Sequence, residues 1–365
     1  MDYNSFRRKS RKIFVGKVGV GGDSPLSVQS MTNVPSGDFP AVYAQMKALE
    51  ASGCDIVRMT VPDASAVSTL SKLKESDLTI PIVADIHFNY RLALDSVSAG
   101  ADKIRINPGN IGGPERIRAV VRACSASSIP IRIGVNGGSL EKDILAKFGS
   151  PTAEALVASA SYHVSLLERF DFTDIIVAVK SSDVRTVIAA NRLLSEKFDY
   201  PLHLGVTESG TYGPGLLRSC TGIGSLLCDG IGDTLRVSLT ADPLVEVREG
   251  RALLRSLGFD ARPSVRIVSC PTCGRTKIDL ISIASELEER LRDYPVDRPL
   301  TLAVMGCAVN GPGEAREADL GIAGGDGDAL LFEKGRILRK IPESGMVDAL
   351  LAELDRLTGR TRGTR

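Results

Sequence analysis

Three cysteines near the carboxyl end of the chain have a spacing that suits a metal or cluster site. Cys270 and Cys273 form a Cys-Pro-Thr-Cys motif, and Cys307 follows further along the chain. One proline and three glycines flank them, Pro271, Gly274, Gly306 and Gly311, and these residues bend the backbone as a bound group requires. Three thiolates together with one non-cysteine ligand suit a 4Fe-4S cluster.

Other interpretations of these cysteines stay open from the residues alone. A structural zinc site normally has four ligands in two close pairs, and the second pair is missing here. A redox-active cysteine pair needs no third cysteine, and plain thiols are the remaining alternative. Glu314 follows Cys307 across a Gly-Pro-Gly turn and is a candidate fourth ligand, although an ordinary surface glutamate explains it more simply.

The elements that must position such residues alternate regularly over the first 260 residues. Eight short segments rich in Ile and Val read as buried parallel strands, and a helical pattern follows each of them. Eight such units predict a TIM barrel. A doubly wound open sheet is the alternative, but Gly19-Val-Gly21-Gly22 precedes the first barrel strand and suits a hairpin turn better than a nucleotide fingerprint. The predicted strands are 26–30, 55–60, 80–84, 103–106, 131–135, 174–179, 202–206 and 234–239.

The predicted strands end in polar and mostly cationic residues, and the carboxyl ends of TIM-barrel strands carry the active site. Five cations at one mouth would repel each other strongly unless an anion lay between them. Arginine matches phosphate oxygens in bidentate geometry, so we expect a small phosphorylated ligand. Glu208, the only glutamate of the set, could act as a general acid or base. The set comprises Thr32, Asn33, Arg58, Asp85, His87, Arg105, Asn107, Arg132, Asn136, Lys180, Thr207, Glu208, Arg236 and Ser238.

The pattern changes after a short polar connection at 259–266. Strands are predicted at 265–269, 300–305, 329–332 and 336–338, with helices near 279–292 and 346–357. We therefore expect an α/β chain of two domains. Residues 1–258 form a TIM (β/α)8 barrel that binds substrate, and residues 259–365 form a small α+β domain that carries the cysteines.

Composition excludes several classes of protein. With 43% apolar residues in 365, the chain is not disordered. Its 45 Lys and Arg against 44 Asp and Glu offer no charge for binding nucleic acid. No apolar stretch reaches the length of a membrane helix, and the basic segment 7–12 reads as a solvated leader. Seven cysteines without a signal peptide indicate a reducing, cytoplasmic location.

Motifs spread over nearly the whole chain resemble those of a known family, the bacterial 4-hydroxy-3-methylbut-2-enyl diphosphate synthases of the non-mevalonate isoprenoid pathway. The motifs are VQSMTN at 28–33, DIVRMTVP at 55–62, PIVADIHFN at 81–89, KIRINPGNIG at 103–112, RIGVNGGSLEKD at 132–143, LGVTESG at 204–210, GIGDTLRVSLTADP at 230–243, SCPTCGRT at 269–276 and MGCAVNGPGEA at 305–315.

The resemblance implies a reaction and a set of site residues. The reaction is the two-electron reductive ring opening and dehydration of 2-C-methyl-D-erythritol 2,4-cyclodiphosphate, with electrons from reduced ferredoxin or flavodoxin. A 4Fe-4S cluster is implied on Cys270, Cys273, Cys307 and Glu314, with Glu208 near the reacting carbons. We count Asp85 with the substrate-binding residues that the resemblance implies, which are Arg58, His87, Arg105, Arg132, Asn136, Lys180, Arg236 and Ser238.

Two rival functions belong to other classes. One is a barrel lyase or aldolase that uses Lys180 as a Schiff base and holds zinc in its tail, and the other is a non-enzymatic iron–sulfur carrier. The resemblance also implies a head-to-tail homodimer. Chain geometry agrees, because the eight residues 259–266 span at most about 27 Å, too little to lay the second domain over the mouth of its own barrel.

Overall fold

The computed structural model describes residues 3–292, 294–307 and 315–360. The chain divides into two compact units, Met1–Asp260 and Ala261–Arg365. None of the helices in these described ranges has the length and apolar character that a bilayer crossing requires.

The first unit is a TIM barrel, as the sequence predicts. Its eight strands pair in parallel in the order β8-β7-β6-β5-β4-β3-β10-β9. An isolated bridge between Val177 and Leu202 closes the ring. The strands are β3 (Ser27–Met31), β4 (Ile56–Thr60), β5 (Ile82–Asp85), β6 (Lys103–Ile106), β7 (Ile131–Asn136), β8 (Ile175–Lys180), β9 (His203–Leu204) and β10 (Thr234–Leu235).

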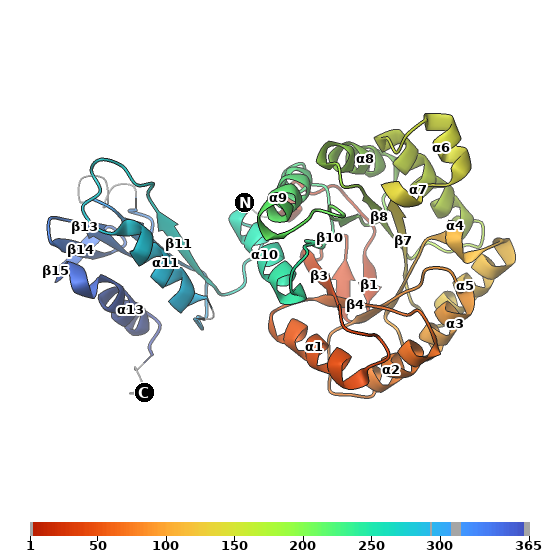
Figure 1. Ribbon diagram of the computed structural model, residues 1–365, viewed down its shortest axis with the longest axis horizontal. Helices are drawn as coiled ribbons and strands as arrows, with labels where there is room; N and C mark the ends of the chain where they lie inside the picture. Colours follow the sequence, from red (N-terminus) through yellow and green to blue (C-terminus); the bar gives the residue numbers. More distant parts are fainter. Residues whose placement is uncertain (1–2, 293, 308–314, 361–365) are drawn as a thin grey trace. The chain divides into compact units, whose positions relative to one another are not determined.

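Helices surround these strands on the outside of the barrel (Figure 1). Aspartate side chains cap several of them. Asp38, for example, accepts a hydrogen bond from the Ala41 backbone N–H at the start of α1. The helices are α1 (Phe39–Ala51), α2 (Ala64–Lys74), α3 (Tyr90–Ser98), α4 (Pro108–Ile111), α5 (Pro114–Ala126), α6 (Lys142–Phe148), α7 (Ala153–Glu168), α8 (Val184–Lys197), α9 (Tyr212–Cys228) and α10 (Pro243–Ser256).

Alternation along the strands separates the core from the interior of the barrel. Outward residues such as Ile104 and Ile133 join the apolar core beneath the helices. Inward residues begin apolar, because Ile56, Val83 and Ile176 form one cluster at the amino ends of their strands. Towards the carboxyl ends the inward residues become polar and cationic. Most charged inward residues therefore lie towards the carboxyl ends of the strands, and Lys103 at the start of β6 is an exception.

A β-hairpin closes the apolar end. Strands β1 (Ile13–Val15) and β2 (Val18–Val20) pair antiparallel, and Val15 and Val20 pack on the apolar inward cluster. The predicted hairpin is present, but its turn contains Gly16, which has a left-handed φ of 54°. Gly19 lies within β2 instead.

The basic segment at 7–12 does not form the solvated leader expected from its charge. The Arg7 guanidinium is buried and lies 2.5 Å from Asp233, which precedes β10. The Arg8 guanidinium donates to the carbonyls of Phe198 and Tyr200. These arginines find buried acceptors on the barrel, which a charge pattern alone does not reveal.

The second unit is a five-stranded mixed sheet in the order β11-β12-β13-β14-β15. Strands β11 (Val265–Ser269), β12 (Leu300–Met305) and β13 (Leu320–Gly324) run parallel, while β14 (Asp328–Glu333) and β15 (Arg336–Pro342) are antiparallel. Apolar residues of α11 (Leu280–Leu291) and α13 (Met346–Leu357) pack against it.

Strand β13 is absent from the sequence prediction because glycines interrupt its apolar pattern. A Cβ at Gly321 would lie 2.3 Å from the Phe332 ring of β14, so this strand needs glycine where the ring packs. The residue types in β13 therefore depend on packing against the neighbouring strand β14, which the sequence pattern does not reveal.

Candidate active site

All nine residues predicted to bind substrate line one cavity of ≈ 210 Å³ at the carboxyl ends of the strands. They come from six strands and the short segments that follow them. Met31, Gly134, Ala178 and Thr207 complete the lining. The nine are Arg58, Asp85, His87, Arg105, Arg132, Asn136, Lys180, Arg236 and Ser238.

Asp85 organises one side of this cavity. Its Oδ1 accepts a hydrogen bond from Arg105 Nη1 at 2.9 Å, and its Oδ2 lies 3.5 Å from Arg58 Nε. Burial alone would raise the pKa of Asp85, but Arg58, Arg105 and Arg132 together hold it below its ordinary value. The carboxylate therefore stays ionised at neutral pH and partly balances the arginines around it.

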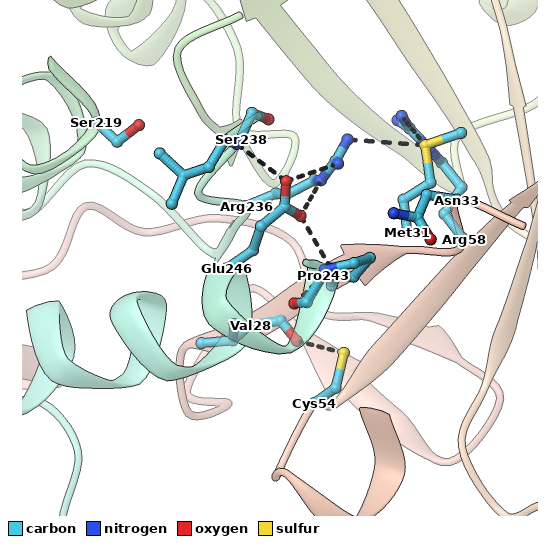
Figure 2. A network of polar contacts seen from close by, with 12 residues as sticks. Val28, Met31, Asn33, Cys54, Arg58, Ser219, Arg236, Ser238, Pro243 and Glu246 are labelled. Carbon is cyan, nitrogen blue, oxygen red and sulfur yellow. Dashed lines mark hydrogen bonds and ion pairs between the residues drawn. The ribbon is translucent and has the colours of Figure 1, made fainter. Parts of the chain in front are cut away.

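Glu246 on α10 holds Arg236 from behind, and sequence reasoning missed it. Its two carboxylate oxygens accept from Arg236 Nε and Nη2, both at 3.0 Å (Figure 2). The same carboxylate accepts from Ser30 Oγ and from the Leu239 backbone N–H. An acidic residue in the first turn of a helix, on its buried side, is the signal that could have identified it.

The Met31 sulfur lies between two guanidinium groups (Figure 2). Arg58 donates to Met31 Sδ from Nε at 3.2 Å and from Nη2 at 2.8 Å, and Arg236 Nη1 donates at 3.7 Å. Burial and neighbouring arginines lower the pKa of Arg58 to about 10, against the attraction of Asp85. Arg58 and Arg236 thus share a neutral acceptor, which balances no charge.

Small residues make room for the long cationic side chains. A Cβ at Gly134 on β7 would lie 2.7 Å from Arg105 Nε, and one at Gly205 would lie 2.9 Å from Lys180 Nζ. Sequence reasoning did not single out these inward glycines. Each glycine occupies an inward position in the alternating pattern of its strand. That position is the signal that could have identified it in the sequence.

Positive charge exceeds negative charge around the cavity. Among the residues that line it, Arg58, Arg105, Arg132, Lys180 and Arg236 oppose only Asp85. Burial first, and then repulsion from the arginines, lowers the pKa of Lys180 well below its ordinary value. An anion in this cavity would relieve that repulsion.

A second cavity of ≈ 440 Å³ adjoins the first and shares Asn136 and Thr207 with it. Glu208 lines this cavity, not the cationic one, and its side chain is exposed. Glu208 also has a left-handed φ of 52°, a strained conformation for a residue with a side chain. Ser209 fixes the turn by donating to the Ser238 carbonyl at 2.5 Å.

A buried histidine anchors the loop that forms the other wall of this second cavity. His163 Nε2 on α7 lies 2.5 Å from Glu141 Oε1, just after the 3-10 helix η2 (Gly137–Ser139). Although burial would raise it, the pKa of Glu141 falls to about 2, chiefly because the His163 imidazole lies against the carboxylate. A Cβ at Gly109 would meet both side chains. Loops after β6 and β7 therefore share one anchor.

Three strand-end residues of the predicted set line neither cavity. Asn33 pairs with the Gln45 side chain. Asn107 caps α4 by accepting from the Gly109 N–H, and Thr32 is buried. Local capping and packing explain these positions.

The three cysteines lie at one edge of the second unit. Cys270 follows β11 and Cys307 follows the neighbouring strand β12. Cys270 Sγ accepts a hydrogen bond from the Gly306 N–H at 3.2 Å. Cys273 is exposed, and a hydrogen bond from the Arg275 N–H lowers the pKa of its thiol. Glu314 lies outside the described residues.

These thiols fit an iron–sulfur cluster in donor type. All three are free, and parallel pairing brings Cys270 and Cys307 to the same sheet edge. Within the described ranges, however, no three His, Cys, Asp or Glu side chains lie close enough together to hold a metal ion.

Comparison with known proteins agrees with this geometry. The family model "GcpE TIM-barrel domain" matches residues 10–251, and "GcpE protein C-terminal domain" matches residues 266–356. The chain belongs to the GcpE family.

Curated relatives of this GcpE chain share one name, "4-hydroxy-3-methylbut-2-en-1-yl diphosphate synthase (flavodoxin)". The Clostridium acetobutylicum protein is 53% identical over 96% of this chain and 99% of its own length. Those of Geobacter sulfurreducens and Shouchella clausii are also 53% identical over 96% of this chain, and over 98% and 95% of their own lengths. The family expected from the motifs is confirmed.

We predict that Asp85→Asn destabilises this GcpE chain by about 3–5 kcal/mol, because it leaves buried arginines without their carboxylate. Inorganic pyrophosphate should restore part of the loss in thermal melting. The stabilisation by Asp85 is complete above the ordinary pKa of Asp and is lost as the pH falls through its lowered pKa. The difference between the two proteins should therefore shrink in acid. Asp229→Asn, in an exposed pair with Arg192, is the control and should cost about 0–1 kcal/mol.

We predict that Gly134→Ala displaces the Arg105 guanidinium and leaves the fold intact, because only the mobile end of that side chain meets the new Cβ. Losing a charge-assisted hydrogen bond should weaken pyrophosphate binding about 10–100-fold in calorimetric titration. Gly113→Ala, where a Cβ meets nothing within 4 Å, should bind as wild type does. If Gly134→Ala bound pyrophosphate as tightly as wild type, binding would not depend on the present place of the Arg105 guanidinium.

Proposed function

We propose that this chain carries out the reaction for which its relatives are named. It opens the ring of 2-C-methyl-D-erythritol 2,4-cyclodiphosphate and dehydrates it to 4-hydroxy-3-methylbut-2-enyl diphosphate. Two electrons and two protons enter and one water leaves. The supporting observation is one cavity at the barrel mouth in which five cations face a single carboxylate.

The electron donor is reduced flavodoxin, as the names of the relatives state for those proteins. Ferredoxin is the other donor that the motifs led us to expect. The location we propose is the reducing cytoplasm, in keeping with the free state of the cysteines.

The cationic residues bind and orient the substrate. Arginine forks and the Lys180 ammonium match the oxygens of a diphosphate. Asp85 and Glu246 hold Arg105 and Arg236 in place, so these guanidinium groups need little reorganisation when the anion arrives. His87 is exposed at the rim and can donate to a bound oxygen.

Glu208 is the proposed proton-transfer group. It lies in the second cavity, beside Asn136 and Thr207, which also line the first. A substrate whose diphosphate occupies the cationic cavity can extend its carbon chain towards this carboxyl group. Glu208 would then give a proton to the hydroxyl group that leaves as water.

Cys270, Cys273, Cys307 and Glu314 are the residues that would hold a 4Fe-4S cluster. When bound, such a cluster supplies the substrate with electrons one at a time. The half-buried positions of Cys270 and Cys307 support this assignment, because thiols at a partly covered edge are both protected and reachable.

The rival functions are not favoured. A lowered pKa at Lys180 would also suit a Schiff base, but the relatives carry the name of a diphosphate synthase and not that of a lyase or aldolase. A pure electron carrier would have no use for a cavity lined by five cations.

An anaerobic assay with the cyclic diphosphate and a chemical reductant tests this function. We predict that Glu208→Gln keeps substrate affinity and lowers turnover by about 10²–10⁴-fold, the usual contribution of general acid–base catalysis. Glu154→Gln, on the outer helix α7, is the matched control and should turn over normally. A loss of affinity without a loss of turnover would make Glu208 a binding residue.

We predict that replacing Cys270, Cys273 or Cys307 by Ala abolishes iron retention, because two thiolates are too few to hold the cluster. Iron content and visible absorption of anaerobically purified protein measure this. Cys54→Ala and Cys124→Ala remove buried thiols of the barrel core and should keep full iron content. Full iron in Cys307→Ala would refute the ligand assignment.

We also propose a head-to-tail homodimer, in which each active site combines one barrel with the partner's cysteine-bearing domain. The short connection between α10 and β11 supports it. Glu208→Gln and Cys307→Ala, each inactive alone, should regain activity in mixed dimers, because one of the two sites then holds both intact parts. Proven heterodimers that stay inactive would show that the cluster serves its own barrel.

A further inference from the structure

Two titratable side chains lie inside the barrel, out of reach of the cavity. Lys103 on β6 and His203 on β9 are each 0% exposed, and neither lines the cationic cavity. Lys103 Nζ donates to Gln29 Oε1 at 3.3 Å, a neutral acceptor on β3 across the barrel. Within the described part of the chain, neither ring nitrogen of His203 has a hydrogen-bond partner.

Arg132 connects these two side chains with the cavity. It is 1% exposed, lines the cavity and pairs in register with Arg105, which follows Lys103 by one inward position on β6. Its positive charge repels a proton on either Lys103 or His203. Burial first, and then this repulsion, lowers the pKa of Lys103 and that of His203 well below their ordinary values.

Most of the charged side chains that the surrounding strands direct towards Lys103 and His203 are cationic. The carboxylates are Asp85, which is shared by two arginines, and Glu246, which is held by Arg236 from outside the barrel. Strand β3 contributes only the neutral Gln29 and Met31. The cations are Arg58 from β4, Arg105 from β6, Arg132 from β7, Lys180 from β8 and Arg236 from the end of β10.

Arginine cannot relieve this excess of charge by releasing a proton, because its guanidinium keeps its proton in proteins. Lysine and histidine can release theirs. Lys180 and His87 line the cavity, so both are in direct contact with whatever binds there. Lys103 and His203 can respond only through the field of the arginines.

We infer that Lys103 and His203 are neutral in the ligand-free barrel and that they take up a proton when a diphosphate enters the cavity. The inference rests on the proposed function, since it requires a diphosphate at this site. The bound anion offsets the charge of Arg132 and Arg58, so a further positive charge beneath them becomes tolerable. Lys103 and His203 are thus positioning residues that adjust the interior charge to the ligand.

Linkage gives the sign of the effect. A proton that is taken up on binding makes affinity fall as the pH rises, by up to about tenfold per pH unit for each proton. Each phosphorus of the cyclic diphosphate carries one strongly acidic oxygen, so the ligand does not itself titrate near neutral pH. A pH-dependent affinity therefore reports on the protein.

The test is calorimetric titration of the full-length protein with the cyclic diphosphate, without reductant, in buffers that differ in ionisation enthalpy. Wild type should take up protons on binding. Lys103→Met and His203→Gln should each take up fewer, and the double variant fewest, with a flatter dependence of affinity on pH. Lys74→Met, which removes a lysine paired with Asp102 outside the barrel, should match wild type.

Thermal melting of the ligand-free proteins is an independent measurement. A neutral Lys103 can be replaced by Met of similar length with no loss of melting temperature, because its amine donates only a long hydrogen bond to the neutral Gln29 side chain, and replacing buried polar groups by apolar ones of similar volume often stabilises. The inference would be wrong if the double variant took up as many protons as wild type, or if Lys103→Met lost much stability. Either result would leave the proposed function untouched. Failure of wild type to bind the cyclic diphosphate would overturn the proposed function and the inference with it.

Discussion

Cations crowd the interior of the barrel, and their mutual repulsion governs how the cavity and the residues around it are arranged. Five cationic side chains line a cavity of ≈ 210 Å³, and only Asp85 lines it with them as an anion. Such an arrangement is costly without a ligand, because like charges in a poorly solvated interior repel strongly. The barrel tolerates it by placing Asp85 between two arginines and Glu246 behind a third. The positive charge that these two carboxylates leave unbalanced would favour the binding of an anion.

The architecture confines this charge to one end. Apolar inward residues and the hairpin of β1 and β2 fill most of the amino end of the barrel, so the interior cations other than Lys103 gather towards the carboxyl ends. Gly134 and Gly205 then leave the volume that Arg105 and Lys180 occupy. The cavity is thus built as much by missing side chains as by those present, and its stability depends on the outer apolar core beneath the helices.

In the second unit, too, the ends of parallel strands bring functional candidates together. Parallel pairing of β11 and β12 brings the cysteines that follow them to one edge, whatever their separation in sequence. The Gly306 N–H donates to the Cys270 sulfur there. The cavity at the barrel mouth and the cysteines of the second unit thus both depend on the ends of parallel strands.

Local sequence patterns were enough to predict the class of fold and most of the residues that line the cavity. Strand–helix alternation is a local pattern, and residues at the ends of parallel strands must converge, so nine predicted residues meet in one cavity. Tertiary structure alone decided the rest. Glu246 lies far from Ser30 and Arg58 along the chain and joins the site through packing, and Gly321 in β13 leaves the space that the Phe332 ring occupies. The burial of Lys103 and Arg7 likewise depends on neighbours that are distant along the chain, since a charged residue shows its environment only after the fold encloses it.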